Sequence, residues 1–265
     1  NQMWRNPCLN DTYEPGSTFK IVTAAAGLEA GVVNLTDQFS CPGFRIVEDR
    51  KIRCHKVGGH GGETFLQGMM NSCNPVLIDV GQRLGPERYY QYFKQFGLLG
   101  KTGIDLPGEA DASTLVYQVD NMGPMDLATN SFGQNYNCTM VQMAAGYASL
   151  INGGSYYEPH VVKEILNDEG SVVKSVSPNL VRETVSESTS NFINNALYQT
   201  VSGDGGTAGA AAVAGYEVAG KTGTAQKQPR AEKNYLVSFI GYAPQENPEI
   251  MIYVVIDEPN APDQS

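Results

Sequence analysis

The sequence has no run of apolar residues long enough to cross a membrane. A transmembrane helix needs about twenty predominantly apolar residues in succession, and no stretch of the 265 residues approaches this length. The amino terminus, NQMWRNPCLN, also lacks the charged-then-apolar pattern of a secretory signal. The sequence therefore predicts neither a span nor a targeting segment. Because it starts shortly before an apparent helix, we expect a longer protein, with the missing part on the amino-terminal side.

Basic residues are scarce as well. Lysine and arginine number 18 against 28 aspartates and glutamates, so that the formal net charge is −10. Proteins that follow a nucleic acid backbone neutralise phosphates with many lysine and arginine side chains. We therefore expect no nucleic acid partner.

Histidine is rarer still, since the chain contains only His55, His60 and His160. No histidine stands near a Gly-x-Ser-x-Gly sequence, which marks hydrolases whose serine is activated by histidine. A Ser-His-Asp triad is therefore not predicted. A serine nucleophile in this chain needs a different base.

A serine and a lysine stand three residues apart in the stretch DTYEPGSTFKIVTAAAGLEAG, residues 11–31. Ser17 follows a Pro-Gly turn, and Lys20 lies at the spacing that puts both side chains on one face of a helix. A serine hydroxyl is a poor nucleophile until a neighbouring group takes its proton. Lys20 is therefore a candidate base for Ser17. Taken alone, so short and common a pattern more often marks a helix cap followed by a solvated lysine.

Helical patterns occupy the middle of the chain and strand patterns its end. Apolar periodicity predicts helices over about 18–29, 63–85, 86–99, 138–151 and 186–202. A pair of strands is predicted around the turn at 168–170, and three further strands lie in YEVAGKTGTAQ, NYLVSFIGYAPQ and EIMIYVVIDEP. Strands and helices do not alternate regularly, so we predict an α+β fold. Its antiparallel sheet is flanked by helices, and an all-helical subregion lies beside it.

Two further motifs follow the serine and lysine. The sequence NSCN supplies the hydroxyl of Ser72 and the amide of Asn74. The sequence GKTGTA, on a predicted strand, supplies Lys221, Thr222, Gly223 and Thr224. A cation and hydroxyls on such a strand suit an extended substrate that ends in a carboxylate. Ser-x-x-Lys, a Ser-x-Asn element and Lys-Thr-Gly together are the signature of penicillin-binding proteins and serine β-lactamases.

These ordered motifs make the chain resemble the transpeptidase domain of a class B penicillin-binding protein, a peptidoglycan D,D-transpeptidase. The resemblance covers essentially the whole chain, through WRNP, YEPGSTFK, GHGG, NSCN, KTGIDLPGE, FGQ, GKTGTAQ and FIGYAP. It implies that residues 1–265 form one domain of a longer membrane-anchored protein at the extracytoplasmic face of the bacterial cytoplasmic membrane. It also implies a glycosyltransferase partner, and a following helix without which the sheet exposes apolar area.

The resemblance implies a mechanism that needs no cofactor. Ser17 attacks the carbonyl between the two terminal D-alanines of a stem peptide, and Lys20 accepts its proton. Ser72 relays this proton to the departing D-alanine, while Asn74 orients Lys20 and the substrate amide.

The resemblance also assigns substrate binding to the strand. Lys221, Thr222 and Thr224 hold the terminal carboxylate, and Gly223 lets the substrate lie against the strand. The backbone N–H groups of Ser17 and Thr224 form the oxyanion hole. β-Lactams imitate the D-Ala-D-Ala end and leave Ser17 acylated.

A second Lys-Thr-Gly sequence, Lys101-Thr102-Gly103, precedes a Pro-Gly turn in KTGIDLPGE. This copy lacks the strand context that substrate binding requires. We therefore assign the binding role to Lys221 and a structural role to the segment at Lys101.

The five cysteines are an odd number without regular spacing, which argues against a disulfide-stapled mini-domain. Four residues, Cys41, Cys54, His60 and Cys73, offer three thiolates and an imidazole, a full shell for a structural zinc. Some members of the resembled family carry a metal at this loop. His55 is an alternative ligand, and a Cys41–Cys54 disulfide beside a buried Cys73 is the competing interpretation. Cys8 and Cys138 are predicted to be inert packing residues.

Three other activities remain open for the same motifs. A serine β-lactamase shares the first and third motifs, but no acidic residue stands out as the base for deacylation. A D,D-carboxypeptidase uses water as the acceptor, and a β-lactam sensor is acylated without turnover.

Overall fold

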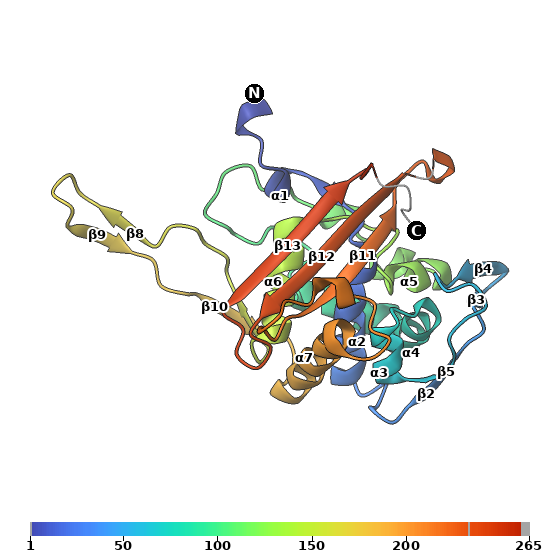
Figure 1. Ribbon diagram of the computed structural model, residues 1–265. Coiled ribbons are helices and arrows are strands. Elements are labelled where there is room, and N and C mark those ends of the chain that lie inside the picture. Colours follow the sequence, from blue (N-terminus) through green and yellow to red (C-terminus); the bar gives the residue numbers. More distant parts are fainter. Residues whose placement is uncertain (1, 233, 261–265) are drawn as a thin grey trace.

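A three-stranded antiparallel sheet is the largest sheet in the described part of the computed structural model, residues 2–232 and 234–260 (Figure 1). Its strands run in the order β11 (Ala219–Gln226), β12 (Tyr235–Ala243) and β13 (Ile250–Asp257). Helices α6 (Met140–Ile151) and α7 (Glu187–Ser202) contact it, and the turn that precedes helix α2 (Lys20–Glu29) lies against β11. The predicted α+β fold is confirmed.

A helical subregion lies beside the sheet (Figure 1). It contains α3 (Phe65–Met70), α4 (Asn74–Gln95) and α5 (Pro124–Asn130). The hydroxyl of Thr64 and the side chain of Gln67 cap the start of α3 reciprocally. The predicted boundary between helices at residues 85 and 86 is a kink inside α4, where Gly85 has φ 73° and Pro86 follows. A break that the sequence did not predict lies at residues 71–73 and contains Ser72.

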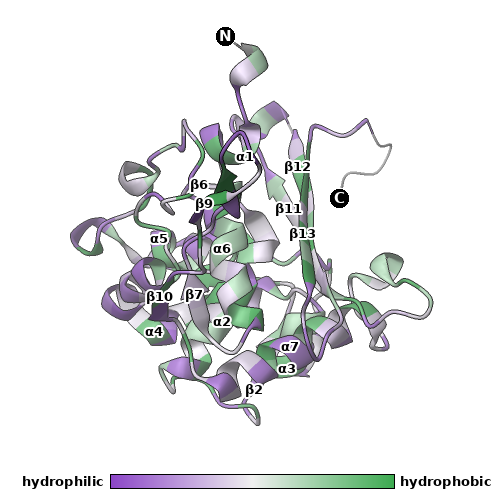
Figure 2. Ribbon diagram, turned by 90° about the vertical axis from the view of Figure 1, so that its left-hand side faces the viewer, coloured by the Kyte–Doolittle hydropathy of each residue, from purple (hydrophilic) through white to green (hydrophobic). Residues whose placement is uncertain are grey.

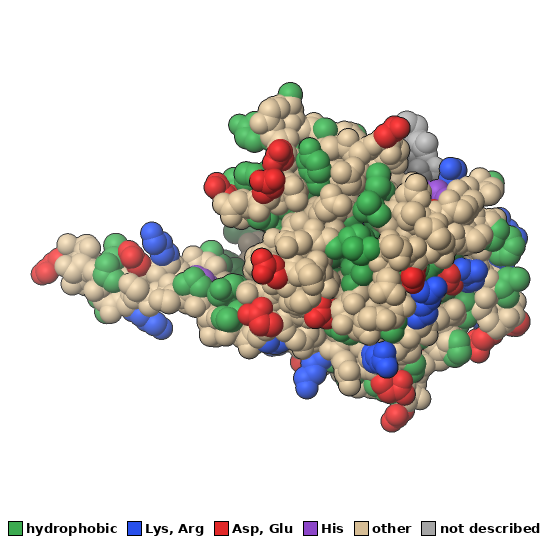
Figure 3. Space-filling model, turned by 90° about the horizontal axis from the view of Figure 1, so that it is seen from below, with side chains coloured by type: hydrophobic (Ala, Val, Ile, Leu, Met, Phe, Trp, Pro, Cys, Tyr) green, Lys and Arg blue, Asp and Glu red, His purple; other side chains and the backbone are tan. Residues whose placement is uncertain are grey.

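Short ribbons and single turns complete the fold. The paired strands are β1 (Thr12–Tyr13) with β6 (Cys138–Thr139), β2 (Gln38–Cys41) with β5 (Gly61–Thr64), β3 (Phe44–Val47) with β4 (Arg50–Arg53), β7 (Ser155–Tyr157) with β10 (Leu180–Glu183), and β8 (Glu164–Leu166) with β9 (Val172–Ser175). Short helices are η1 (Gln2–Trp4), α1 (Pro7–Asn10), η2 (Gly16–Phe19), η3 (Ser113–Leu115), η4 (Val119–Asn121), η5 (Gly209–Ala211) and η6 (Arg230–Glu232). The predicted hairpin β8–β9 projects from the body as an arm (Figures 1 and 3).

The two faces of the three-stranded sheet differ in their exposure to solvent. Lys221, Ile240 and Tyr253 are aligned across the three strands, and Ile240 is fully buried. The alternate positions of β13, Ile250, Ile252, Val254 and Ile256, are 47–65% exposed. In Figure 2, helices α2 and α6 lie on one side of the sheet. The apolar outer face that the resemblance implied is therefore present on β13.

None of the described helices combines the length and the apolarity that crossing a bilayer requires.

Candidate active site

Ser17 lies in η2, a short 3-10 turn directly before helix α2. Gly16 has φ +61°, and its N–H donates to the carbonyl of Gly133 at 2.8 Å. A Cβ atom on Gly16 would lie 2.6 Å from the carbonyl oxygen of Thr224. Only glycine therefore allows the Ser17 turn to lie this close to strand β11.

Lys20 begins α2 and is almost completely buried. Its Nζ donates to the backbone carbonyl of Ser72 at 2.6 Å and to the Ser72 Oγ at 3.0 Å. Burial lowers the pKa of Lys20 to about 8, against the opposing effect of negative charge at Cys54 and Cys73. A neutral amine is therefore accessible near neutral pH, as a general base requires.

Ser72 lies between α3 and α4 with a positive φ of 51°, which is rare for residues other than glycine. Such backbone strain concentrates at functional sites. The Ser72 N–H donates to the Met69 carbonyl, and the Cys73 N–H donates to the Gly68 carbonyl, so that the turn is held at both positions. The structure thus brings Ser72 to Lys20 through a tightly constrained turn.

Asn74 begins α4, and its amide donates to the backbone carbonyl of Arg53 at 2.9 Å. This bond ties the start of α4 to strand β4. Within residues 2–232 and 234–260, the side chain of Asn74 makes no hydrogen bond to Lys20. The orienting role that the resemblance implies for Asn74 stays a prediction.

Lys221 is fully buried on β11, and its Nζ donates to the Thr222 carbonyl at 2.9 Å. Burial, followed by the neighbouring charge of Lys20, lowers the pKa of Lys221 well below its usual value. A Cβ atom on Gly223 would lie 2.9 Å from the Thr18 Cγ2, so that the Ser17 turn touches this motif directly. Thr224 is exposed and Thr222 half-buried, which leaves both accessible.

The second Lys-Thr-Gly copy lies in a loop, as its sequence context predicts. Lys101 is exposed, and the N–H and hydroxyl of Thr102 donate to Glu109 Oε1 at 2.6 and 2.7 Å. The N–H of Gly103 donates to the other oxygen of Glu109 at 3.2 Å. This Lys-Thr-Gly copy therefore stabilises its own loop through hydrogen bonds to Glu109.

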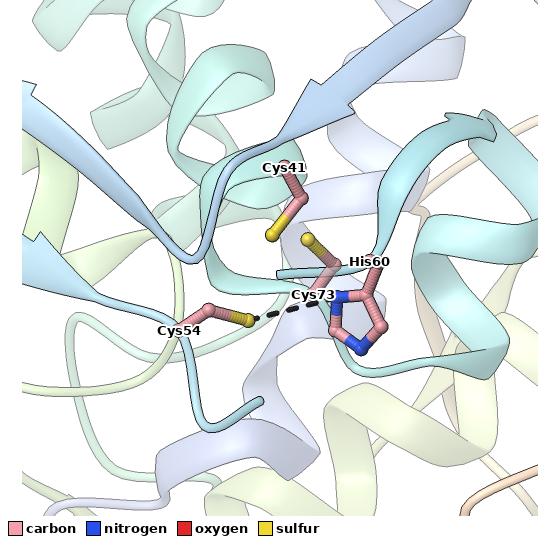
Figure 4. A group of neighbouring side chains, drawn as sticks. All are labelled: Cys41, Cys54, His60 and Cys73. Carbon is pink, nitrogen blue, oxygen red and sulfur yellow. Dashed lines mark hydrogen bonds between the residues drawn. The ribbon is translucent and has the colours of Figure 1, made fainter. Parts of the chain in front are cut away.

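The four proposed metal ligands lie together (Figure 4). One ligand atom each from Cys41, Cys54, His60 and Cys73 lies within 4.8 Å of all the others. Cys54 Sγ lies 3.8 Å from Nδ1 of His60 and equally far from Nδ1 of His55, the alternative ligand. Burial lowers the pKa of His60, which favours the neutral imidazole that binds metals.

All five cysteines are free in the structure. Cys138 is buried, as predicted, but the prediction for Cys8 is wrong because Cys8 is exposed. The short helix α1 buries the neighbouring Leu9 instead, so that Cys8 lies on its exposed side.

Sequence reasoning missed two acidic residues at the site. Buried Glu63 has Oε1 3.9 Å from His60 Nδ1, and its Oε2 accepts from Asn71 at 3.0 Å. Glu14 accepts two hydrogen bonds from Arg230, at 2.9 and 3.0 Å. This pair joins the approach to Ser17 to the loop after β11. The position of Glu14 in YEPGSTFK was the available signal, whereas Glu63 had none.

Comparison with known proteins agrees with this geometry. The family model of the penicillin binding protein transpeptidase domain matches residues 1–265. Stage V sporulation protein D of Bacillus subtilis is 44% identical over 260 residues, which cover 96% of this chain and 40% of that protein. Penicillin-binding protein PbpB of Mycolicibacterium smegmatis is 32% identical, over 96% of this chain and 40% of that protein. The chain thus spans about two fifths of the length of these relatives.

Solved structures show the same relationship. Penicillin binding protein 3 of Mycobacterium tuberculosis, as the apo form and in complex with aztreonam, matches with a TM-score of 0.87 and 31% identity. The match covers 97% of this chain and 59% of that one. Because the family model matches from one end of the chain to the other, the chain belongs to the penicillin binding protein transpeptidase domain family, and the resemblance to the class B members is confirmed.

Proposed function

We propose that this chain is a peptidoglycan D,D-transpeptidase domain that cross-links stem peptides through an acyl-enzyme on Ser17. The observation that carries the proposal is the buried Lys20 amine, which is hydrogen-bonded to Ser72 and lies one turn from Ser17. The Lys-Thr-Gly strand packs against the same turn. A relative named peptidoglycan D,D-transpeptidase FtsI homolog, from Mesostigma viride, is 29% identical over 98% of this chain and supports the assignment.

In the acylation step, Ser17 Oγ attacks the carbonyl carbon of the penultimate D-alanine and its proton passes to Lys20. The N–H groups of Ser17 and Thr224 stabilise the oxyanion. The C–N bond then breaks, and the proton reaches the departing amine of D-alanine through Ser72. Lys221, with Thr222 and Thr224, binds the terminal carboxylate.

In the second step, the amine of a neighbouring stem peptide attacks the ester on Ser17. The amine loses a proton to Lys20, Ser17 Oγ is released and regains a proton, and an amide cross-link remains. A β-lactam follows only the first step, because its opened ring stays attached and blocks the acceptor. The aztreonam complex of the Mycobacterium tuberculosis relative supports this kind of ligand.

The test is the site of the covalent adduct. After treatment with benzylpenicillin, peptide mass spectrometry should find one adduct, on Ser17, and none in a Ser17→Ala protein. An adduct on another residue, or the absence of any adduct, contradicts the mechanism.

The acceptor distinguishes the proposal from the alternatives with the same motifs. A thioester donor with a D-amino acid acceptor should give the transfer product. Fast hydrolysis of the β-lactam instead indicates a β-lactamase. Release of D-alanine with water as the acceptor indicates a carboxypeptidase. Acylation without turnover of any donor indicates a sensor.

We also propose that Cys41, Cys54, His60 and Cys73 bind a structural zinc. In tetrahedral zinc sites the ligand atoms lie roughly 3.3–3.8 Å from one another, given bond lengths of about 2.0–2.3 Å. The four atoms lie within 4.8 Å, and the Cys54–His60 separation is 3.8 Å, so small movements complete the shell. Because Cys73 lies between Ser72 and Asn74, a bound zinc would tie the loop at residues 41–60 to the Ser72 turn.

Elemental analysis of protein purified without added metal tests this proposal. We expect near-stoichiometric zinc and five reduced thiols, and a loss of zinc in Cys41→Ala but not in the control Cys138→Ala, which removes a buried thiol outside the cluster. Chelation should lower the unfolding temperature and slow β-lactam acylation, because structural zinc contributes folding free energy. A Cys41–Cys54 disulfide in metal-free protein contradicts the proposal.

We further propose that the domain belongs to a membrane-anchored protein at the extracytoplasmic face of the cytoplasmic membrane, with a glycosyltransferase partner. The similarity to bacterial penicillin-binding proteins supports this placement, since the polymer that they modify lies outside that membrane. Crosslinking in cells that carry the full-length protein tests both parts.

A further inference from the structure

One tyrosine hydroxyl contacts both ends of the segment that carries Ser17. Tyr253 lies on β13, and its hydroxyl is 3.3 Å from the Thr18 Oγ1. It also accepts a hydrogen bond from the hydroxyl of Tyr13. Tyr13 and Thr18 bound the six residues that include the Pro-Gly turn and Ser17. A strand that supplies none of the proposed catalytic groups therefore holds the nucleophile segment.

The direction of the hydrogen bonds follows from counting protons. The Thr18 hydroxyl donates its single proton to the Pro15 carbonyl at 2.9 Å. Tyr253 must then donate to Thr18, and Tyr13 donates to Tyr253. Burial raises the pKa of Tyr253 to about 12 and that of Tyr13 well above its usual value, so both keep their protons. Such a chain is polarised in one direction, which strengthens each bond.

Thr18 also contacts the substrate-binding strand. It is fully buried, and its Cγ2 would lie 2.9 Å from a Cβ atom on Gly223. A displacement of Thr18 therefore changes the distance between the N–H groups of Ser17 and Thr224. These are the two proposed oxyanion donors, whose effect depends on their position before the reaction begins.

We propose that Tyr253 is a positioning residue for Ser17: its hydroxyl holds Tyr13 and Thr18 together and thereby fixes the turn that presents the nucleophile beside β11. This inference rests on the proposed acylation of Ser17. It adds Tyr253, a residue of β13, to the residues that determine the rate of that acylation.

The experiment measures benzylpenicillin acylation of the whole chain, separating the rate constant at saturation from the concentration for half-saturation. Tyr253→Phe should lower the rate constant about tenfold, which is less than the roughly hundredfold loss caused by a misplacement of 1 Å. The benzylpenicillin concentration that gives half-saturation should stay nearly unchanged. Thr18→Val should show a similar loss, and Thr18→Ser should restore most of the rate. The double variant Tyr253→Phe with Thr18→Val should lose little more than either single variant, because both break one chain.

Tyr89→Phe is the matched control. It removes a buried tyrosine–threonine hydrogen bond of the same kind, 3.2 Å long, between Tyr89 and Thr23 of α2. We expect it to lower the unfolding temperature but to change the acylation rate less than about twofold, within the effect of a small structural change. An equal loss of rate in Tyr89→Phe and Tyr253→Phe overturns the inference, as does an unchanged rate in Tyr253→Phe. If the wild-type protein shows no adduct on Ser17, the proposed function fails and the inference falls with it, whereas a wild-type adduct with normal Tyr253→Phe kinetics removes the inference alone.

Discussion

The amine of Lys20 makes two hydrogen bonds to Ser72, one to its carbonyl and one to its hydroxyl. A neutral amine has two N–H groups and one lone pair. If both N–H groups point at Ser72, the lone pair remains for the proton of Ser17. The geometry at this residue therefore suits the deprotonated lysine.

The pH dependence of acylation tests the charge of Lys20. Its pKa of about 8 lies below that of an ordinary lysine, and the amine is neutral only above that value. The second-order rate constant with benzylpenicillin should therefore rise with pH and level off above about 8, since this constant reports the free enzyme. Lys20→Ala should remove the rise and lower the rate roughly a hundredfold. A rate that falls across the same range contradicts the assignment.

Ser72 combines a hydroxyl with a strained backbone, and two substitutions measure the effects of these two features separately. Ser72→Ala removes only the hydroxyl, whereas Ser72→Gly also relieves the positive φ of 51°. Both variants should lose acylation to a similar extent. Ser72→Gly should be more stable than Ser72→Ala by about 1 kcal/mol in urea denaturation, because left-handed backbone costs about 1–2 kcal/mol outside glycine. Equal stability would show that the turn is not strained.

At the scale of elements, the two Lys-Thr-Gly copies show that the same three residues have different roles on a strand and in a loop. Lys221 is buried at the centre of the site, whereas Lys101 is exposed beside a loop closed by Glu109. Lys221→Met should weaken β-lactam acylation at least tenfold, as expected when a charge-assisted contact to carboxylate is lost. Lys101→Met should leave acylation unchanged. A reversed result in stopped-flow measurements would move the binding site to the other copy.

The contact between the Gly133 loop and the Ser17 turn is the second prediction at this scale. Gly133 has φ +85°, and a Cβ atom there would lie 2.0 Å from the Gly16 carbonyl oxygen. Gly133→Ala should therefore displace the Ser17 turn and reduce both stability and acylation. Gly153 has φ +93° with nothing within 4 Å, so Gly153→Ala measures the backbone cost alone, about 1–2 kcal/mol. Equal acylation by the two variants contradicts the proposed contact.

At the scale of the whole molecule, the outer face of β13 is an apolar surface. Ile250, Ile252, Val254 and Ile256 point away from the face that carries Tyr253 and Lys221. Contiguous apolar patches on a protein surface favour association. This face points away from the active site, although the same strand carries Tyr253 on its other face.

Substitution on this face should change association without changing catalysis. The double variant Ile252→Thr with Ile256→Thr keeps β-branched residues suited to a strand and removes apolar surface. We expect less self-association of this chain in sedimentation velocity and an unchanged acylation rate. Val173→Thr, at a site that is 66% exposed on the β8–β9 hairpin, is the control and should change neither. A slower acylation rate in the double variant would show that the two faces of the sheet are coupled.

Local chemistry in the sequence predicted most of the main helices and strands and the order of the motifs. Apolar periodicity predicted the helix after Ser17. β-Branched and aromatic content predicted β12 and β13, and the strand-like segment between polar turns predicted β11. Spacing placed Lys20 one turn after Ser17, and the strand-like segment around GKTGTA placed Lys221 on a strand. These features depend on neighbouring residues, so a single sequence contains them.

Contacts between distant residues were decided only by the tertiary structure. Lys20 meets Ser72 across 52 residues, Arg230 meets Glu14 across 216, and Tyr253 meets Thr18 across 235. The break between α3 and α4 also escaped prediction, because apolar periodicity continues through it. The sequence by itself determined which chemical groups are present and on which elements they lie. Only packing decided which of them touch, because a contact between distant residues depends on how whole elements fit together and not on the local chain.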